Sequence, residues 1–140
     1  LEITAVEDGL DLRLQWTAKT PTRLPEAIWL GFNPAPHSTS GESWRFNKMG
    51  LDLDPLDVVS KGNRNLHGVT GAVGTGRFSI LSPDAALVCP GTPHLLNFDD
   101  KAPDLRRGIA YNLFNNVWGT NFPMWSADPA AFRFSLRWRA

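Results

Sequence analysis

Apolar and polar residues alternate with a period of two near both ends of the chain. From Leu10 to Trp16, every second residue is Leu or Trp, and the residues between them are Asp, Arg and Gln. From Phe132 to Trp138, Phe, Leu and Trp alternate with Arg and Ser. Successive side chains of a strand point to opposite faces of a sheet, so this pattern is typical of strands with one buried and one solvated face. We predict a strand in each segment.

Shorter apolar runs between these two segments predict further strands. They are Ile3–Val6, Ala27–Phe32, Trp44–Met49, His67–Val73, Arg77–Leu81, Ala86–Val88, Leu95–Phe98 and Ile109–Phe114. Many short strands at close spacing are typical of a sandwich, and no window keeps a 3.6-residue period over three turns. We therefore predict an all-β fold, an antiparallel β-sandwich with almost no helix, as a single domain over residues 1–140.

Turn-forming residues separate the predicted strands. Hairpin turns are expected at Glu7–Gly9 and Gly74–Gly76. Longer loops rich in Pro, Gly or Asp are expected at 33–42, 99–107 and 118–131, and binding residues of a sandwich usually lie in such loops. One helical turn could form at Pro83–Leu87, with Ser82 as its cap.

The charge balance argues against two classes of partner. Fourteen Lys and Arg against fourteen Asp and Glu give a formal net charge of zero, so no overall field attracts the chain to nucleic acid or an anionic membrane. No apolar stretch approaches the roughly 18 residues that span a bilayer, and no basic-then-apolar leader is present at the start. The sequence does not identify a cellular compartment.

Because the chain begins at Leu1 within a strand-like pattern, we expect it to be an excised piece of a longer polypeptide.

The segment Tyr111–Trp125 is the densest in aromatic and amide side chains. A sugar offers an apolar C–H face to an aromatic ring and hydroxyls to amide groups, so this mixture is typical of carbohydrate sites. Trp118 and Trp125 are the candidate stacking surfaces, with Asn121 between them. The alternative is that the Trp rings fill the core while the Asn side chains bond the backbone of an irregular loop. Composition alone leaves both interpretations open.

No local pattern of a catalytic or metal site is present. A glycosidase needs two carboxylates about 5 to 10 Å apart, and no spacing forces any two acidic residues together. The acidic candidates are Glu26, Glu42, Asp84, Asp99 and Asp100, and the histidines are His37, His67 and His94. None of the histidines has the ligand spacing of a zinc site, and we expect His67 to be partly buried with backbone partners. We predict no catalytic residue, no metal and no cofactor.

Two other reactive or charged groups have a simple structural interpretation. Cys89 is the one cysteine, so an internal disulfide is excluded, and a buried apolar thiol is favoured over a nucleophile. Arg133, Arg137 and Arg139 fall on the polar face of the last predicted strand. A solvated or interdomain face is favoured there over anion recognition.

Several strings in the last two-thirds of the chain, from Trp44 onward, resemble one enzyme family. The most specific is Asn115–Phe122, Asn-Asn-Val-Trp-Gly-Thr-Asn-Phe, continued by Pro-Met-Trp. The others are Leu66–Val69, Ser82–Val88, Pro90–Pro93 and Phe132–Phe134. In this order they resemble the C-terminal β region of α-mannosidase-like enzymes, glycoside hydrolase family 38 and its bacterial relatives.

The resemblance implies a β-supersandwich packed behind an N-terminal α/β catalytic barrel that holds zinc and the nucleophile. No string here matches the zinc or nucleophile motifs of that barrel, so this chain would be an accessory part. Residues of such β domains can approach the substrate cleft, and the residues expected to do so here are Trp118, Asn121 and His67, beside Trp125.

The leading hypothesis is therefore a non-catalytic C-terminal β-sandwich domain of a glycoside hydrolase. Its expected partner is the N-terminal catalytic domain of the same polypeptide, and a glycan can bind at the Trp118–Trp125 loop. One alternative is a free-standing carbohydrate-binding module, which requires the two Trp rings to lie in one open groove. The other is a structural interaction domain, marked by an exposed apolar patch near the chain start.

Overall fold

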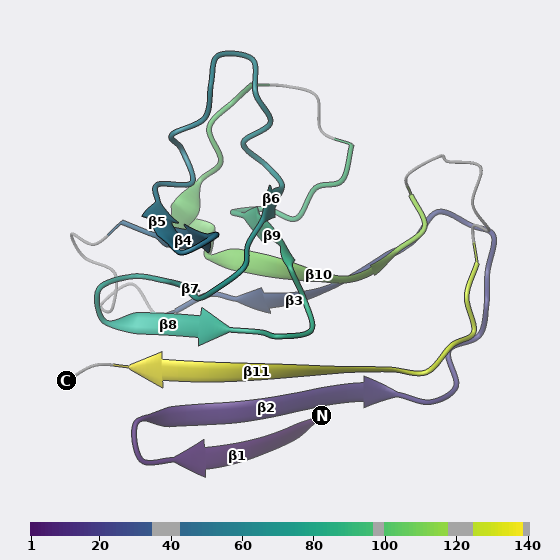
Figure 1. The fold of residues 1–140 in the computed structure, drawn as a ribbon. Coiled ribbons are helices and arrows are strands. Elements are labelled where there is room, and N and C mark those ends of the chain that lie inside the picture. Colours follow the sequence, from purple (N-terminus) through teal and green to yellow (C-terminus); the bar gives the residue numbers. More distant parts are fainter. Residues whose placement is uncertain (35–42, 97–99, 118–124, 139–140) are drawn as a thin grey trace.

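The fold consists almost entirely of β-strands in two sheets. The computed structural model describes residues 1–34, 43–96, 100–117 and 125–138. The strands are β1 (Glu2–Val6), β2 (Gly9–Trp16), β3 (Ala27–Phe32), β4 (Arg45–Lys48), β5 (Leu51–Leu53), β6 (His67–Gly68), β7 (Val73–Gly74), β8 (Phe78–Leu81), β9 (Leu87–Pro90), β10 (Ile109–Asn115) and β11 (Ala130–Trp138). One sheet has the order β1-β2-β11-β8-β7-β4-β5 and the other β3-β10-β9-β6 (Figure 1). All pairs are antiparallel, which confirms the predicted sandwich-like all-β fold.

The two strands with the clearest alternation, β2 and β11, lie side by side in the larger sheet (Figure 1). Phe134 is opposite Leu12 and Leu136 is opposite Leu10 in the register. Phe134 and Leu136 are buried, and the two leucines of β2 pack against the core. Both predicted strands are confirmed. Trp138 follows the same alternation but ends the strand and is 47% exposed.

The segment His67–Val73, predicted as one strand, forms two strands in different sheets. β6 pairs with β9, whereas β7 pairs with β4 and β8. Between them, Val69 N–H donates to the carbonyl of Ala86, and Thr70 N–H donates to the carbonyl of Asn47. The hydrogen bonding therefore passes from one sheet to the other within these residues. A period-two pattern cannot reveal this change, because partners do not enter the pattern.

Two further differences concern short elements. β5 was not predicted, and it forms a hairpin with β4 through Met49 and Gly50, whose φ angles are 53° and 88°. Positive φ at both central residues is typical of a tight type I′ hairpin turn. The predicted strand Leu95–Phe98 is wrong at Leu95 and Leu96, which lie outside any strand. Leu96 has a φ of 55°, in the left-handed region, which interrupts an extended chain.

Local turn chemistry behaves largely as predicted. The Glu7–Gly9 turn joins β1 to β2 as a tight hairpin. Ser82 Oγ accepts backbone N–H groups two and three residues ahead, as a cap would, but no helical turn follows. Within the described residues the only helical element is the short 3₁₀ turn η2 (Leu105–Arg107), where the side chain of Asp104 accepts the backbone N–H of Arg106.

Aromatic rings fill the space between the two sheets. Tyr111 of β10 and Phe134 of β11 contact edge to face, with ring centroids 5.2 Å apart, and Phe32 of β3 packs on both rings. The Tyr111 hydroxyl donates to the carbonyl of Ile80 in β8 at 3.3 Å. Burial raises the pKa of Tyr111. The phenol therefore stays neutral and connects the two sheets through one hydrogen bond.

Candidate functional site

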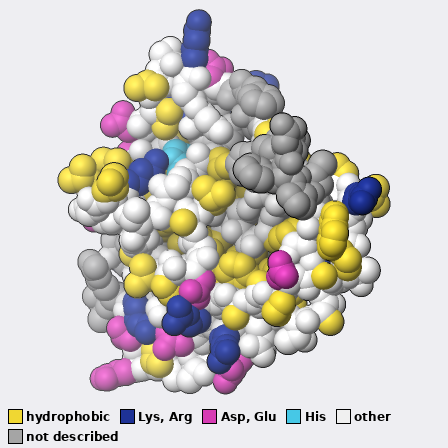
Figure 2. All heavy atoms as spheres, turned by 45° about the vertical axis from the view of Figure 1, so that its right-hand side comes forward, with side chains coloured by type: hydrophobic (Ala, Val, Ile, Leu, Met, Phe, Trp, Pro, Cys, Tyr) yellow, Lys and Arg dark blue, Asp and Glu magenta, His cyan; other side chains and the backbone are white. Residues whose placement is uncertain are grey.

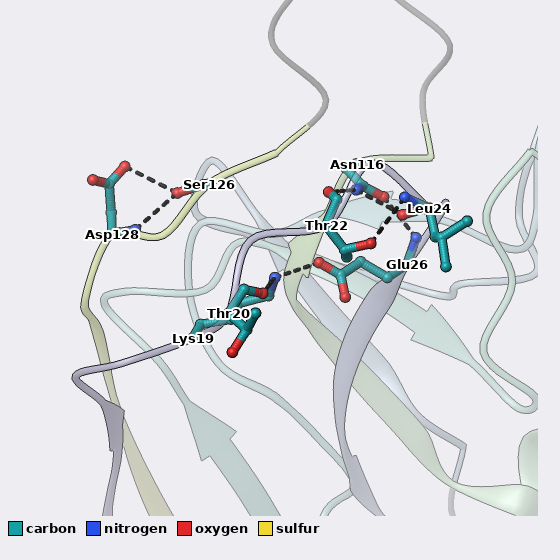
Figure 3. Close-up of polar contacts among 8 residues, drawn as sticks. All are labelled: Lys19, Thr20, Thr22, Leu24, Glu26, Asn116, Ser126 and Asp128. Carbon is teal, nitrogen blue, oxygen red and sulfur yellow. Dashed lines mark hydrogen bonds and ion pairs between the residues drawn. The ribbon is translucent and has the colours of Figure 1, made fainter.

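Asn116, directly after β10, fixes the segment that leads into β3. Its Oδ1 accepts the backbone N–H of Glu26 at 2.6 Å, and its Nδ2 donates to the carbonyls of Leu24 at 2.9 Å and Thr22 at 3.4 Å (Figure 3). Its backbone N–H also donates to the Glu26 carbonyl at 3.1 Å. One amide side chain thus satisfies backbone groups that have no strand partner, and it holds residues 22–26 beside the end of β10.

Two more asparagines of this region form side-chain hydrogen bonds inside the fold, and one of them bonds the backbone. The register of β10 against β3 shifts between Asn112 and Phe114. Asn112 Nδ2 donates to the Phe114 carbonyl at 3.2 Å, and Asn115 Nδ2 donates to Asn112 Oδ1 at 2.9 Å. The structural interpretation, in which Asn side chains bond the backbone, is confirmed for Asn112 and Asn116. Asn115 bonds a side chain instead, and its Oδ1 is buried without a hydrogen-bond partner among the described residues. Asn121, the amide expected to contact sugar, lies outside the described residues.

A charge pair lies next to this segment. Lys19 Nζ forms an ion pair with Glu26 Oε1 (Figure 3). The same ammonium lies 4.6 Å from the centroid of the Phe114 ring. Both charged side chains are largely shielded from solvent. The carboxylate of Glu26, one of the acidic candidates, is therefore engaged by a cation from its own segment.

Trp125 lies against the Thr22 segment and is open to solvent. The residue is 47% exposed, and with Pro21, Thr22 and Arg23 it lines a shallow hollow of about 230 Å³. In Figure 1 the connection after β2 and the chain that leads into β11 run side by side at the right. The interpretation of Trp125 as a core ring is wrong. Its predicted companion Trp118 lies outside the described residues.

His67, the remaining residue expected to approach a sugar, is buried in the sandwich. Only 4% of the residue is exposed, and its ring contacts Phe46 edge to face at 5.2 Å. Nε2 donates to the Arg64 carbonyl at 3.0 Å, and Nδ1 accepts from the Lys48 ammonium at 3.0 Å. Burial, and then the positive charge of Lys48, lowers the pKa of His67. The expectation of a buried histidine with a backbone partner is confirmed, and both ring nitrogens are occupied.

Cys89 is buried, as expected. Its Sγ accepts the backbone N–H of His94 at 3.2 Å and donates to the carbonyl of Thr92 at 3.2 Å. Burial raises the pKa of the thiol. A thiol that resists ionisation is a poor nucleophile, so its contribution is to packing.

The arginines on the polar face of β11 are paired with carboxylates. Arg133 forms a two-pronged contact with Asp84, at 2.9 and 2.8 Å, and its backbone N–H donates to the same carboxylate. Arg137 reaches Asp11 at 2.7 Å. These contacts with arginine lower the pKa of Asp84 and of Asp11. The pairing supports a solvated polar face over an anion site, while Arg139 lies outside the described residues.

The remaining titratable residues come together in no ligand set. No group of three His, Cys, Asp or Glu side chains within residues 1–34, 43–96, 100–117 and 125–138 could hold a metal ion. His94 and Asp100 are exposed. His37, Glu42 and Asp99 lie outside the described residues. The two acidic candidates with defined partners, Glu26 and Asp84, are held by Lys19 and Arg133 instead of facing each other.

Sequence reasoning missed the residues that surround Trp125. Thr22 and Arg23 belong to a short Pro-flanked connection that carries no motif, and they meet Trp125 only through the fold. The one usable signal was the Pro21–Pro25 stretch itself, since prolines in a connection restrict its path. When two connections that are far apart in the chain form one site, no short sequence motif reveals it.

No family model, curated protein or solved structure matches the chain. Over the described part of the chain, no helix has the length and apolar character needed to cross a membrane.

Proposed function

We propose that this chain is a non-catalytic β-sandwich domain of a glycoside hydrolase of the α-mannosidase type, and that it contributes to glycan binding at Trp125. The observation that carries the proposal is the half-exposed Trp125 ring over a hollow bordered by Thr22 and Arg23. An open aromatic face beside hydroxyl and guanidinium groups suits a sugar, which presents C–H groups on one face and hydroxyls around its rim.

The size of the hollow is consistent with a single sugar unit. Typical small-molecule pockets enclose about 300–1,000 Å³ and surround most of the ligand. The Trp125 hollow is smaller, about 230 Å³, and shallow. A ring laid on the indole with the rest of the glycan in solvent fits this shape better than an enclosed ligand does.

The chemistry of the described side chains supports an accessory role. Glu26 and Asp84 are each paired with a cation, and His67 has both nitrogens occupied. An acid–base pair for glycoside hydrolysis needs two carboxyl groups that face one bond, and neither of these carboxylates is in such a position. The reactive groups are therefore assigned to the proposed N-terminal catalytic domain.

A second surface, the apolar face of β1, supports contact with the proposed catalytic domain. Ile3 of β1 is opposite Leu12 of β2, so both side chains project to the same face of the sheet. Leu12 packs against the core, whereas Ile3 is 56% exposed and Leu1 is 71% exposed. The inner face of β1 is thus apolar and uncovered. It keeps the structural interaction domain as the second candidate function.

Hydrophobic side chains outside β1 also reach the surface, among them Met49 and Val59. On the face shown in Figure 2 they lie in several separate groups with charged and polar surface between them. Scattered apolar residues of this kind are normal on a monomer surface. The hypothesis of a structural interaction domain therefore rests on the apolar face of β1 and not on the hydrophobic groups visible in Figure 2.

The test compares two tryptophans of equal exposure. Trp125 and Trp138 are each 47% exposed, but Trp138 ends β11 and lines no part of the Trp125 hollow. The 140-residue chain and the variants Trp125→Ala and Trp138→Ala are titrated with manno-oligosaccharides and with a panel of other oligosaccharides by calorimetry. We expect binding in the parent chain and in Trp138→Ala, and its loss in Trp125→Ala.

Three results would contradict the proposal. Binding that survives in Trp125→Ala, or no binding to any oligosaccharide of the panel, would remove the glycan site and leave the interaction domain as the better candidate. Sustained hydrolysis of an aryl mannoside by the purified chain would contradict the accessory role.

A further inference from the structure

Among the described residues that line the Trp125 hollow, Arg23 is the charged one, and its guanidinium has no partner among the described residues. It is exposed, and within the described residues it has neither a hydrogen bond nor an ion pair. Arg106, Arg133 and Arg137 differ from it, because each contacts a carboxylate at 2.7–2.9 Å. A free guanidinium beside an open indole ring can take a ligand oxygen without breaking an existing pair.

The local charge around Arg23 is positive. Residues 17–26 contain Lys19, Arg23 and Glu26, so two positive charges and one negative charge leave a net charge of +1. Lys19 and Glu26 neutralise each other directly. Asp128, on the chain that follows Trp125, accepts the hydroxyl hydrogen of Ser126 at 2.9 Å, and Figure 3 shows it on the opposite side of the close-up from Thr22. Of the described residues that line the hollow, Arg23 therefore carries the charge that no ion pair neutralises.

Guanidinium geometry selects a particular class of ligand group. The planar fork of arginine matches the paired oxygens of a carboxylate or a sulfate, and such charged hydrogen bonds are about twice as strong as neutral ones. We propose that the Trp125 hollow prefers an acidic sugar, with the apolar face of the ring on Trp125 and its carboxylate or sulfate group at Arg23. This inference rests on the proposed glycan-binding function and specifies the substrate class of the same site.

Three probes test whether binding depends on the negative charge of the oligosaccharide and whether a carboxylate or a sulfate is preferred. Mannotetraose is the neutral probe, tetragalacturonate carries carboxylates only, and a κ-carrageenan tetrasaccharide carries sulfates only. Each is titrated against the 140-residue chain by calorimetry. We expect at least one acidic probe to bind about tenfold or more tightly than mannotetraose, the range that one hydrogen bond to a charged group provides. The difference between the two acidic probes identifies the acid.

A matched pair of variants assigns the preference to Arg23. Arg13 of β2 is also exposed, and its guanidinium has no hydrogen bond or ion pair within the described residues, but it does not line the hollow. We expect Arg23→Gln to remove most of the preference for the acidic probe and Arg13→Gln to leave it intact. Because the contact is partly electrostatic, added salt should weaken acidic binding more than neutral binding.

The outcomes distinguish this inference from the function it rests on. If mannotetraose binds as tightly as both acidic probes and depends on Trp125, the glycan site stands and the acidic preference is overturned. If Arg13→Gln weakens acidic binding as much as Arg23→Gln, general charge attraction replaces the proposed contact, and the inference is again overturned. If no probe depends on Trp125, the proposed glycan site itself fails.

Discussion

His67 and Trp125, both expected from the sequence to approach a glycan, lie in regions that are built very differently. His67 is 4% exposed, and its two ring nitrogens contact the Arg64 carbonyl and the Lys48 ammonium, each at 3.0 Å. Trp125 is 47% exposed and lies over a shallow hollow. One aromatic side chain has all of its polar atoms satisfied inside the protein, and the other presents a face to solvent.

The difference follows from the elements that carry the two residues. His67 is part of β6, which pairs with β9, and its ring lies against Phe46 of the opposite sheet. Trp125 lies outside the strands, on the chain that leads into β11. Strand positions between two sheets are enclosed by packing, whereas connections remain on the surface and are free to carry binding groups. The comparison therefore associates the His67 region with stability, and it leaves the Trp125 region accessible for the proposed glycan binding.

The largest effect should come from the ring that encloses His67. Phe46 is fully buried, so Phe46→Ala should lower the free energy of unfolding by about 3–5 kcal/mol through lost transfer free energy and the cavity that remains. Urea denaturation followed by circular dichroism measures this change. A loss below about 1 kcal/mol would mean that the core can collapse around the smaller side chain. The His67 region would then not be the more tightly packed of the two regions.

A smaller effect should appear in the pH dependence of stability. Burial and Lys48 lower the pKa of His67 in the folded protein, so the unfolded chain, with a pKa near 6.5, binds the proton more readily. The contribution of His67 to stability is therefore complete above about pH 6.5 and is lost as the pH falls from there through the lowered pKa of the folded state. Urea denaturation at a series of pH values from about 8 to 5 measures it.

His67→Leu should remove this part of the pH dependence, because the variant has no imidazole to protonate. His94→Gln is the matched control, since His94 is exposed and its side chain is not enclosed by the sheets. An unchanged slope in His67→Leu would show that another group titrates in this range and that the enclosed imidazole does not control stability there.

Sequence alternation predicts what is local in this fold. The strands β2 and β11 were found because Leu10–Trp16 and Phe132–Trp138 alternate strictly, and the turn at Glu7–Gly9 follows from its own residues. The split of 67–73 between two sheets was missed because it depends on pairing with Ala86 and Asn47. Tertiary partners decide such cases, and a single sequence does not contain them.

The candidate site shows the same limit. Trp125 was found because it lies in a segment dense in Trp and Asn, but its exposure depends on what packs on it. Asn116 bonds Leu24 and Glu26, and Trp125 meets Arg23, across most of the length of the chain. Arg23 has no motif and no aromatic neighbour in the sequence. Arg23 is a candidate binding residue only because the fold places the connection after β2 beside Trp125.

The smallest effect should come from removing the Trp125 ring. Trp125→Ala should change the free energy of unfolding by less than about 1 kcal/mol, because a half-exposed ring on a connection leaves no core cavity. Urea denaturation beside Phe46→Ala makes the comparison direct, with Trp138→Ala as the control for losing an equally exposed indole. A loss of about 3 kcal/mol or more in Trp125→Ala alone would show that the ring anchors the Thr22–Glu26 segment. Reduced glycan binding in that variant would then reflect a displaced segment, and only Arg23→Gln could still report on recognition.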